Sequence, residues 1–168
     1  MKKFLIGFVA PFVLLPLVVL VYFALGFAET RSDLSPPAWE TALMKPTVRA
    51  AVKRNAANLS APGVATEDSI IAGGKLYVMG CMGCHGDPGK PYTEDHANFP
   101  PVPQLPHVGT RYSEPEIYWI IKHGIRMTAM SAYGPFYKED ELWSLAAFIR
   151  RINTLTPAEL QAIQPQKH

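Results

Sequence analysis

The feature that most constrains this chain is a five-residue stretch that holds both of its cysteines, Cys81-Met82-Gly83-Cys84-His85. Residues three apart are neighbours on one face of a helix, so the two thiols can reach the same partner molecule. The Cys-x-x-Cys-His pattern is typical of a covalently attached c-type haem, whose iron is then bound by the histidine. The sequence therefore predicts one haem c per chain, with Cys81 and Cys84 as thioether attachments and His85 as the proximal iron ligand.

Three other uses of paired cysteines compete with this interpretation. A disulfide between the two thiols is compatible with an oxidising compartment. A thioredoxin-like redox motif expects a preceding strand in a βαβ unit, whereas a helical pattern precedes Cys81. A structural zinc site needs four ligands, usually in two separated pairs, and the chain has no second cysteine pair. We therefore favour haem.

The N-terminal segment predicts a membrane-spanning helix. From Phe4 to Ala28 there are 25 residues without a charge. At a rise of roughly 1.5 Å per residue, a helix of that length exceeds a hydrocarbon core of ~30 Å. Lys2 and Lys3 supply the positive flank that stays in the cytoplasm, so we expect a single-pass protein of the bacterial inner (cytoplasmic) membrane, with its C-terminal domain in the periplasm.

A cleaved signal peptide has similar features, and it is the alternative for this segment. Gly26 and Ala28 offer a small-x-small cleavage site, which would leave a soluble periplasmic protein. The apolar run is longer than the usual ~7–15 residues of a signal peptide, so we expect the helix to be retained as an anchor. Pro11 and Pro16 kink such a helix without excluding it.

The rest of the chain has helical patterns and no persuasive strand, so the predicted fold class is all-α. We expect an anchor or signal peptide at 1–28, a linker with an amphipathic helix at 29–65, a haem domain at 66–155 and a short capped helix and tail at 156–168. In the linker, Pro36-Pro37 blocks a helix, and the pattern resumes from Lys45 to Leu59. That helix packs on the domain or lies on anionic lipid heads.

The haem domain is predicted to contain three main helices and two long loops. Thr66, the Ser113/Glu116 pair and the Thr156/Glu159 pair are predicted helix starts. One loop, 87–112, has six prolines in 26 residues. Three helices around such loops make a thin core, which indicates that a bound group fills the middle.

The charge pattern gives no support for nucleic-acid binding. The net charge is +2, with seven basic against three acidic residues in 1–66 and nine against eleven in 67–168. A nucleic-acid surface needs a clustered basic face, and the predicted exported domain is mildly acidic.

The chain resembles the class I cytochrome c family, in particular the membrane-anchored single-haem domains similar to the third subunit of cbb3-type oxidases. The resemblance covers about 66–155 and rests on the cysteine-histidine motif, "KHGIRMTAMSAYG" and "ELWSLAAFI". It implies a class I cytochrome c fold around the haem, with a loop methionine as the distal iron ligand. Met130 matches that position, although Ser131 stands where the family usually has proline. Met127 in the same loop is the alternative, followed by His123, His107 or no protein ligand.

The resemblance implies roles for several other residues. The free ring nitrogen of His85 should donate to a backbone carbonyl, and in the family a proline supplies it. The candidates for that carbonyl are Pro100, Pro101 and Pro103, with Leu105 packing on the ring. Gly73 and Tyr77 match family positions that contact the last helix around Leu145 and Phe148. The available donors to the haem propionates are Arg111, Tyr112, Trp119 and Arg126, whereas His96 and His168 are given no role.

These features together predict a one-electron carrier in a respiratory or dehydrogenase chain rather than an enzyme. Its partners would be redox proteins, the membrane, or other subunits of a membrane oxidase or dehydrogenase complex. The alternative is a haem enzyme or a ligand-binding haem sensor with a labile sixth ligand. An enzyme would need acid-base groups beside the iron.

Overall fold

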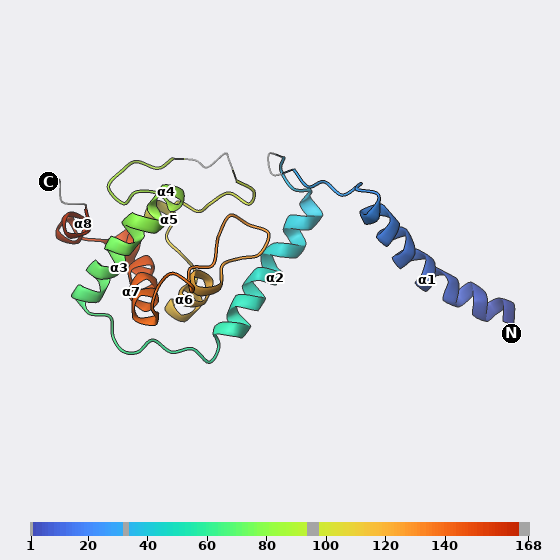
Figure 1. The fold of residues 1–168 in the computed structure, drawn as a ribbon, viewed down its shortest axis with the longest axis horizontal. Coiled ribbons are helices and arrows are strands. Elements are labelled where there is room, and N and C mark those ends of the chain that lie inside the picture. Colours follow the sequence, from blue (N-terminus) through green and yellow to red (C-terminus); the bar gives the residue numbers. More distant parts are fainter. Residues whose placement is uncertain (1, 32–33, 94–97, 165–168) are drawn as a thin grey trace. The chain divides into compact units, whose positions relative to one another are not determined.

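The computed structural model describes residues 2–31, 34–93 and 98–164, with side chains described from residue 7 onward. The chain divides into two compact units, Met1–Ser32 and Asp33–His168. Within the described residues all regular structure is helical and no strand is present, which confirms the predicted all-α class (Figure 1).

The first unit consists of helix α1, Lys2–Ala24, which passes through Pro11 and Pro16 without a break. The segment Gly7–Ala24 has a mean hydropathy of 2.4, so α1 is long and apolar enough to cross a membrane. The helix ends four residues before the apolar run does. Gly26 takes a positive φ of 73° there, and the N–H of Phe27 donates to the carbonyl of Tyr22 at 3.2 Å, as in a Schellman end.

Helix α2, Ala38–Ala56, is longer at its start than the sequence pattern predicted. It begins directly after Pro37 rather than at Lys45, and it ends before Leu59. Pro46 lies inside it and removes one backbone hydrogen bond, but this part of the helix is exposed and water can bind the freed carbonyl. The C-terminal half of α2 packs against α6, where Val52 and Ala56 are buried.

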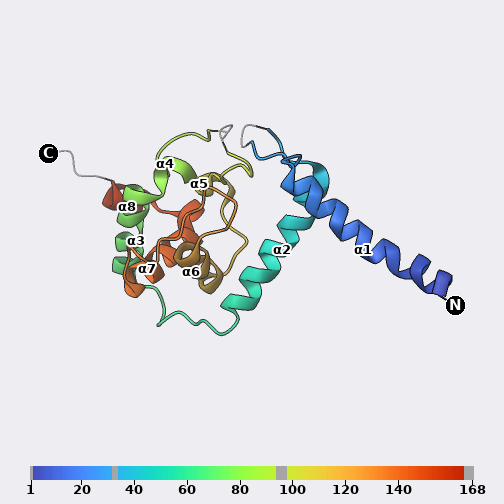
Figure 2. The same cartoon turned by 45° about the vertical axis from the view of Figure 1, so that its right-hand side comes forward.

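The core of the second unit is the crossing of α3, Glu67–Gly80, with α7, Glu139–Arg151 (Figures 1 and 2). The crossing is close because Gly73 carries no side chain: a Cβ there would lie 2.0 Å from the carbonyl oxygen of Ser144. One turn further along α3, the rings of Tyr77 and Phe148 lie 5.4 Å apart. The predicted contact of Gly73 and Tyr77 with the last main helix is confirmed.

Helix α6, Glu114–His123, packs on α7 and completes the core. Three short helices and a 3₁₀ turn connect or end the larger ones: α4 (Met82–His85), α5 (Leu105–Val108), η1 (Ile152–Thr154) and α8 (Pro157–Ile163). The starts of α3, α6 and α8 are those that the sequence predicted. Thr66 accepts from the N–H of Ser69, and the capping boxes begun by Ser113 and Thr156 are formed.

Candidate cofactor-binding site

A cavity of about 560 Å³ lies inside the second unit. Its lining is mostly apolar and comes from the ends of α3 and α4, the proline-rich loop, α6 and the loop that follows α6. Such a volume falls in the range of about 300–1,000 Å³ that is typical of ligand sites. The sequence analysis predicted that a bound group fills the middle of the thin core, and this cavity is large enough to hold one.

Cys81, Cys84 and His85 all line this cavity. Helix α3 ends at Gly80, with Cys81 as its C-cap, and the N–H of His85 donates to the carbonyl of Cys81 at 2.9 Å, so the motif forms a single turn of helix, α4. Cys81 is buried, and burial, reinforced by the nearby Cys84 thiol, raises its pKa to about 11. Cys84 is exposed, and neither cysteine forms a disulfide.

The orientation of His85 is fixed by the proline-rich loop. Nδ1 of its ring lies 3.0 Å from the carbonyl oxygen of Pro103, so Nδ1 donates there and Nε2 is left as the electron-pair donor. This contact selects Pro103 from the three prolines that the sequence left open. Burial lowers the pKa of His85, which favours the neutral imidazole that metal ligation requires.

Two hydrogen bonds hold the motif against its neighbours. The hydroxyl of Tyr77 donates to the carbonyl of Gly86 at 2.7 Å, and Nε2 of Gln104 donates to the carbonyl of Cys84 at 3.0 Å. Gln104 is itself buried. Sequence reasoning did not identify Gln104, because a glutamine in a loop carries no signal of burial until its partner is known.

Met130 lines the cavity from the loop that follows α6. Two bonds make this loop tight: the N–H of Ile125 donates to the carbonyl of Met130 at 3.0 Å, and Thr128 Oγ1 accepts from the N–H of Met130 at 3.1 Å. The loop closes against Gly124, which has a φ of 67° and where a Cβ would lie 2.7 Å from the Met130 carbonyl oxygen. The glycine that ends α6 therefore also places Met130.

The alternative distal ligands do not line the cavity. Met127 has a positive φ of 61°, and 89% of its surface is exposed. His123 is exposed and packs against the ring of Trp119, and His107 packs against Tyr92. His96 and His168 lie outside the described residues.

The sequence offered four hydrogen-bond donors for the haem propionates, and the structure places only two of them at the cavity. Arg111 and Tyr112 line the cavity, whereas Trp119 and Arg126 do not. Two further cations line it, Arg49 and Lys53 of α2, to which the sequence analysis gave no role at the haem site. Their spacing from the haem motif along the chain gave no indication of this position.

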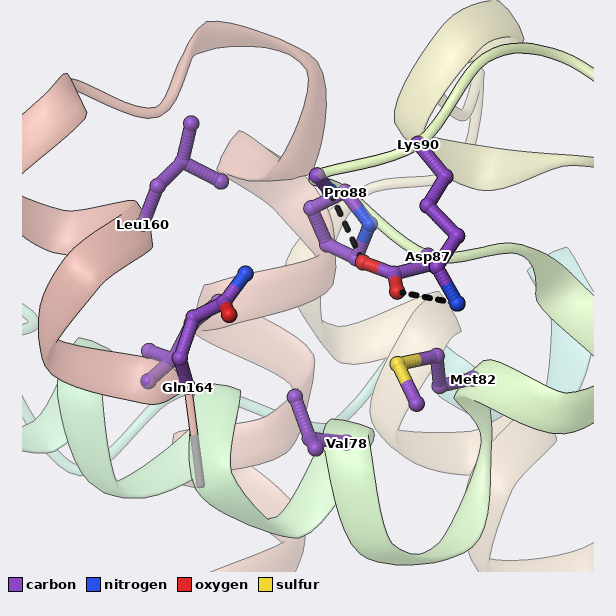
Figure 3. Close-up of a pocket in the computed structure, with 9 residues that line it drawn as sticks. Val78, Met82, Asp87, Pro88, Lys90, Leu160 and Gln164 are labelled. Carbon is purple, nitrogen blue, oxygen red and sulfur yellow. Dashed lines mark hydrogen bonds and ion pairs between the residues drawn. The ribbon is translucent and has the colours of Figure 1, made fainter. Parts of the chain in front are cut away.

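A second, smaller pocket of about 230 Å³ lies between α3, α8 and the residues after His85. Figure 3 shows Asp87 there in an ion pair with Lys90, with the apolar side chains of Val78, Met82 and Leu160 around it. No thiol or imidazole of the described residues lines this pocket. The groups that suit a redox cofactor therefore lie in the larger cavity.

The lining of the larger cavity fits a c-type haem by the chemistry of its donors. It brings together two thiols on one helical turn, an imidazole oriented through its other nitrogen, and a thioether from a different part of the chain. Thiols three residues apart suit two thioether bonds, and imidazole with thioether is a known axial pair for haem iron. The surrounding apolar side chains suit a porphyrin face.

Comparison with known families agrees with this chemistry. Residues 68–149 match the family described as Cytochrome C oxidase, cbb3-type, subunit III. The matched segment runs from the start of α3 almost to the end of α7 and includes both cysteines, His85 and Met130, whereas α2 precedes it. No curated protein and no solved structure matches the chain.

Proposed function

We propose that this chain is a one-electron carrier with a single covalent haem c, because residues 68–149 match the family described as Cytochrome C oxidase, cbb3-type, subunit III. Cys81 and Cys84 hold the haem through thioethers, and His85 and Met130 bind its iron. One observation carries the proposal: these four side chains, from two separate parts of the chain, line one apolar cavity. When bound, the haem supplies an iron that accepts and releases one electron.

The chain's own residues set the conditions for that exchange. The Pro103 carbonyl holds the His85 ring in one orientation, and Gln104 and Tyr77 hold the backbone on both sides of His85. The mostly apolar lining lowers the polarity around the iron site. Histidine with methionine as axial ligands raises the reduction potential and leaves no vacant position, which suits electron transfer rather than substrate binding.

We further propose that α1 anchors the protein in the inner membrane and that the haem domain faces the periplasm. The apolar length of α1 supports the anchor, and the positive residues Lys2 and Lys3 at its start support the orientation. The electron partners would be redox proteins or other subunits of a membrane oxidase or dehydrogenase complex, in a respiratory or dehydrogenase chain. The family match supports the oxidase subunit, and a freely diffusing carrier would make smaller, transient contacts.

The optical spectrum of the full chain in detergent tests the function. We expect a low-spin reduced haem c that does not change when carbon monoxide is added, because both axial positions are filled. Rapid carbon monoxide binding would instead indicate a labile sixth ligand, and a haem enzyme or ligand sensor would then be the better interpretation.

Substitution of the two loop methionines tests the ligand assignment. Met130→Ala should abolish the methionine-to-iron charge-transfer band while leaving the haem attached. Met127→Ala is the matched control, and it should leave the band intact because Met127 points to solvent. A band that survives Met130→Ala but is lost in Met127→Ala would reverse the assignment.

A further inference from the structure

Among the described residues, the lining of the cavity carries an excess of positive charge that the four haem-binding side chains do not explain. Arg49, Lys53 and Arg111 all line it. None of the three forms an ion pair or a side-chain hydrogen bond with any residue in the described part of the chain. Glu116, the carboxylate among the described lining residues, already accepts from the N–H and the hydroxyl of Ser113 at 2.7 and 2.9 Å.

Helix α2 is held so that two of these cations stay at the cavity. Val52 is 1% exposed and Ala56 is 5% exposed, and both lie in the half of α2 that packs on α6. Arg49 and Lys53 are four residues apart, so they lie on the same helix face. Both side chains are exposed and yet line the cavity, which places them where it opens to solvent.

Unpaired cations at the opening of an apolar cavity indicate that its ligand is apolar in the body and anionic at one edge. A porphyrin with two propionate carboxylates has this distribution. We propose that α2, which precedes the cytochrome c domain, acts as a clasp in which Arg49 and Lys53 bind the haem propionates together with Arg111. This inference rests on the proposed haem site. An arginine can bind a carboxylate through two parallel hydrogen bonds, and the lysine adds a point charge.

The clasp has an electrostatic consequence for the redox equilibrium. The oxidised haem carries one more positive charge than the reduced haem, so nearby cations favour the reduced form. Removing one of them should therefore lower the reduction potential. For a charge held in partly desolvated surroundings we expect a change of about threefold to tenfold in the ratio of oxidised to reduced haem, where tenfold corresponds to about 59 mV for one electron.

Neutral variants of the full haem-loaded chain test the clasp by redox titration. Arg49→Gln and Lys53→Gln should each lower the potential, and the double variant should lower it further. The matched controls are Arg54→Gln and Lys45→Gln, which remove the same charges from α2 at positions that do not line the cavity. Arg49→Lys should restore most of the potential, because it keeps the charge.

A second readout reports on the carboxylates themselves. The propionate bending bands of the resonance Raman spectrum respond to hydrogen bonding at these groups, so they should shift in Arg49→Gln and stay unchanged in Arg54→Gln. If the cavity-lining variants match their controls in both measurements, the clasp is refuted. Carbon monoxide binding by the unmodified chain would refute the carrier function alone, whereas absence of covalent haem would refute both.

Discussion

The crossing of α3 and α7 gives a prediction that can be worked directly from the structure, the effect of Gly73→Ala. The added methyl group would lie 2.0 Å from the carbonyl oxygen of Ser144, and real Cβ atoms essentially never approach closer than 3.0 Å. The two helices must therefore separate by roughly 1 Å at this point. The obstacle is backbone, so no side-chain rotation can relieve the contact.

The expected destabilisation follows from two opposing terms. Overpacking of a core costs about 1–3 kcal/mol, and a backbone obstacle belongs at the upper end of that range. Alanine in place of glycine inside a helix raises the free energy of unfolding by about 0.5–1 kcal/mol, because the unfolded chain then has less conformational freedom to lose. We therefore expect a net loss of about 2 kcal/mol from the free energy of unfolding. The separation would also disturb the site, because Tyr77 on the next turn of α3 holds the backbone after His85.

Urea unfolding of the haem-loaded chain, followed by circular dichroism, measures this loss. Gly63→Ala is the control, because nothing lies within 4 Å of a Cβ at that position and its φ is not in the left-handed region. The control should leave the stability unchanged or slightly raised. If Gly73→Ala proves as stable as the control, the close crossing is not a real constraint on this fold.

Two further substitutions test the hydrogen bonds around the site and the core. Gln104→Met should lower the free energy of unfolding by about 0.5–1.5 kcal/mol because it removes the partly buried hydrogen bond from Gln104 to the carbonyl of Cys84; Gln161→Met at an exposed position of α8 is the control, and equal stabilities would contradict the role of Gln104. Hydrogen bonds, chiefly from Lys122, hold the pKa of Glu139 below its ordinary value. The contribution of the Glu139 carboxylate to the free energy of unfolding is therefore fully present at a pH above its ordinary pKa. It is lost as the pH falls through the lowered pKa of the folded state. Glu139→Gln should flatten this acid-side loss of stability, and an unchanged pH profile would show that the bond contributes nothing.

Much of the candidate site could be predicted from the sequence because its chemistry is local. The motif from Cys81 to His85 places two thiols and an imidazole within one helical turn, and a turn keeps its geometry in any fold. The starts of α3, α6 and α8 were equally predictable, since a capping residue such as Thr66 acts on backbone groups three residues away. The apolar length of the first helix needs no tertiary contact to be recognised.

What the sequence left open depends on residues far apart in the chain. The choice of Pro103 among three prolines, the position of Met130 in the cavity with Met127 outside it, and the burial of Gln104 all follow from how the two loops fold back on α3 and α6. The pattern on α2 showed a charged face but could not say what lies opposite that face. Only packing of α2 on α6 brings Arg49 and Lys53 to the cavity. Local composition determines which groups a helix carries, whereas the packing of distant segments determines which of those groups meet.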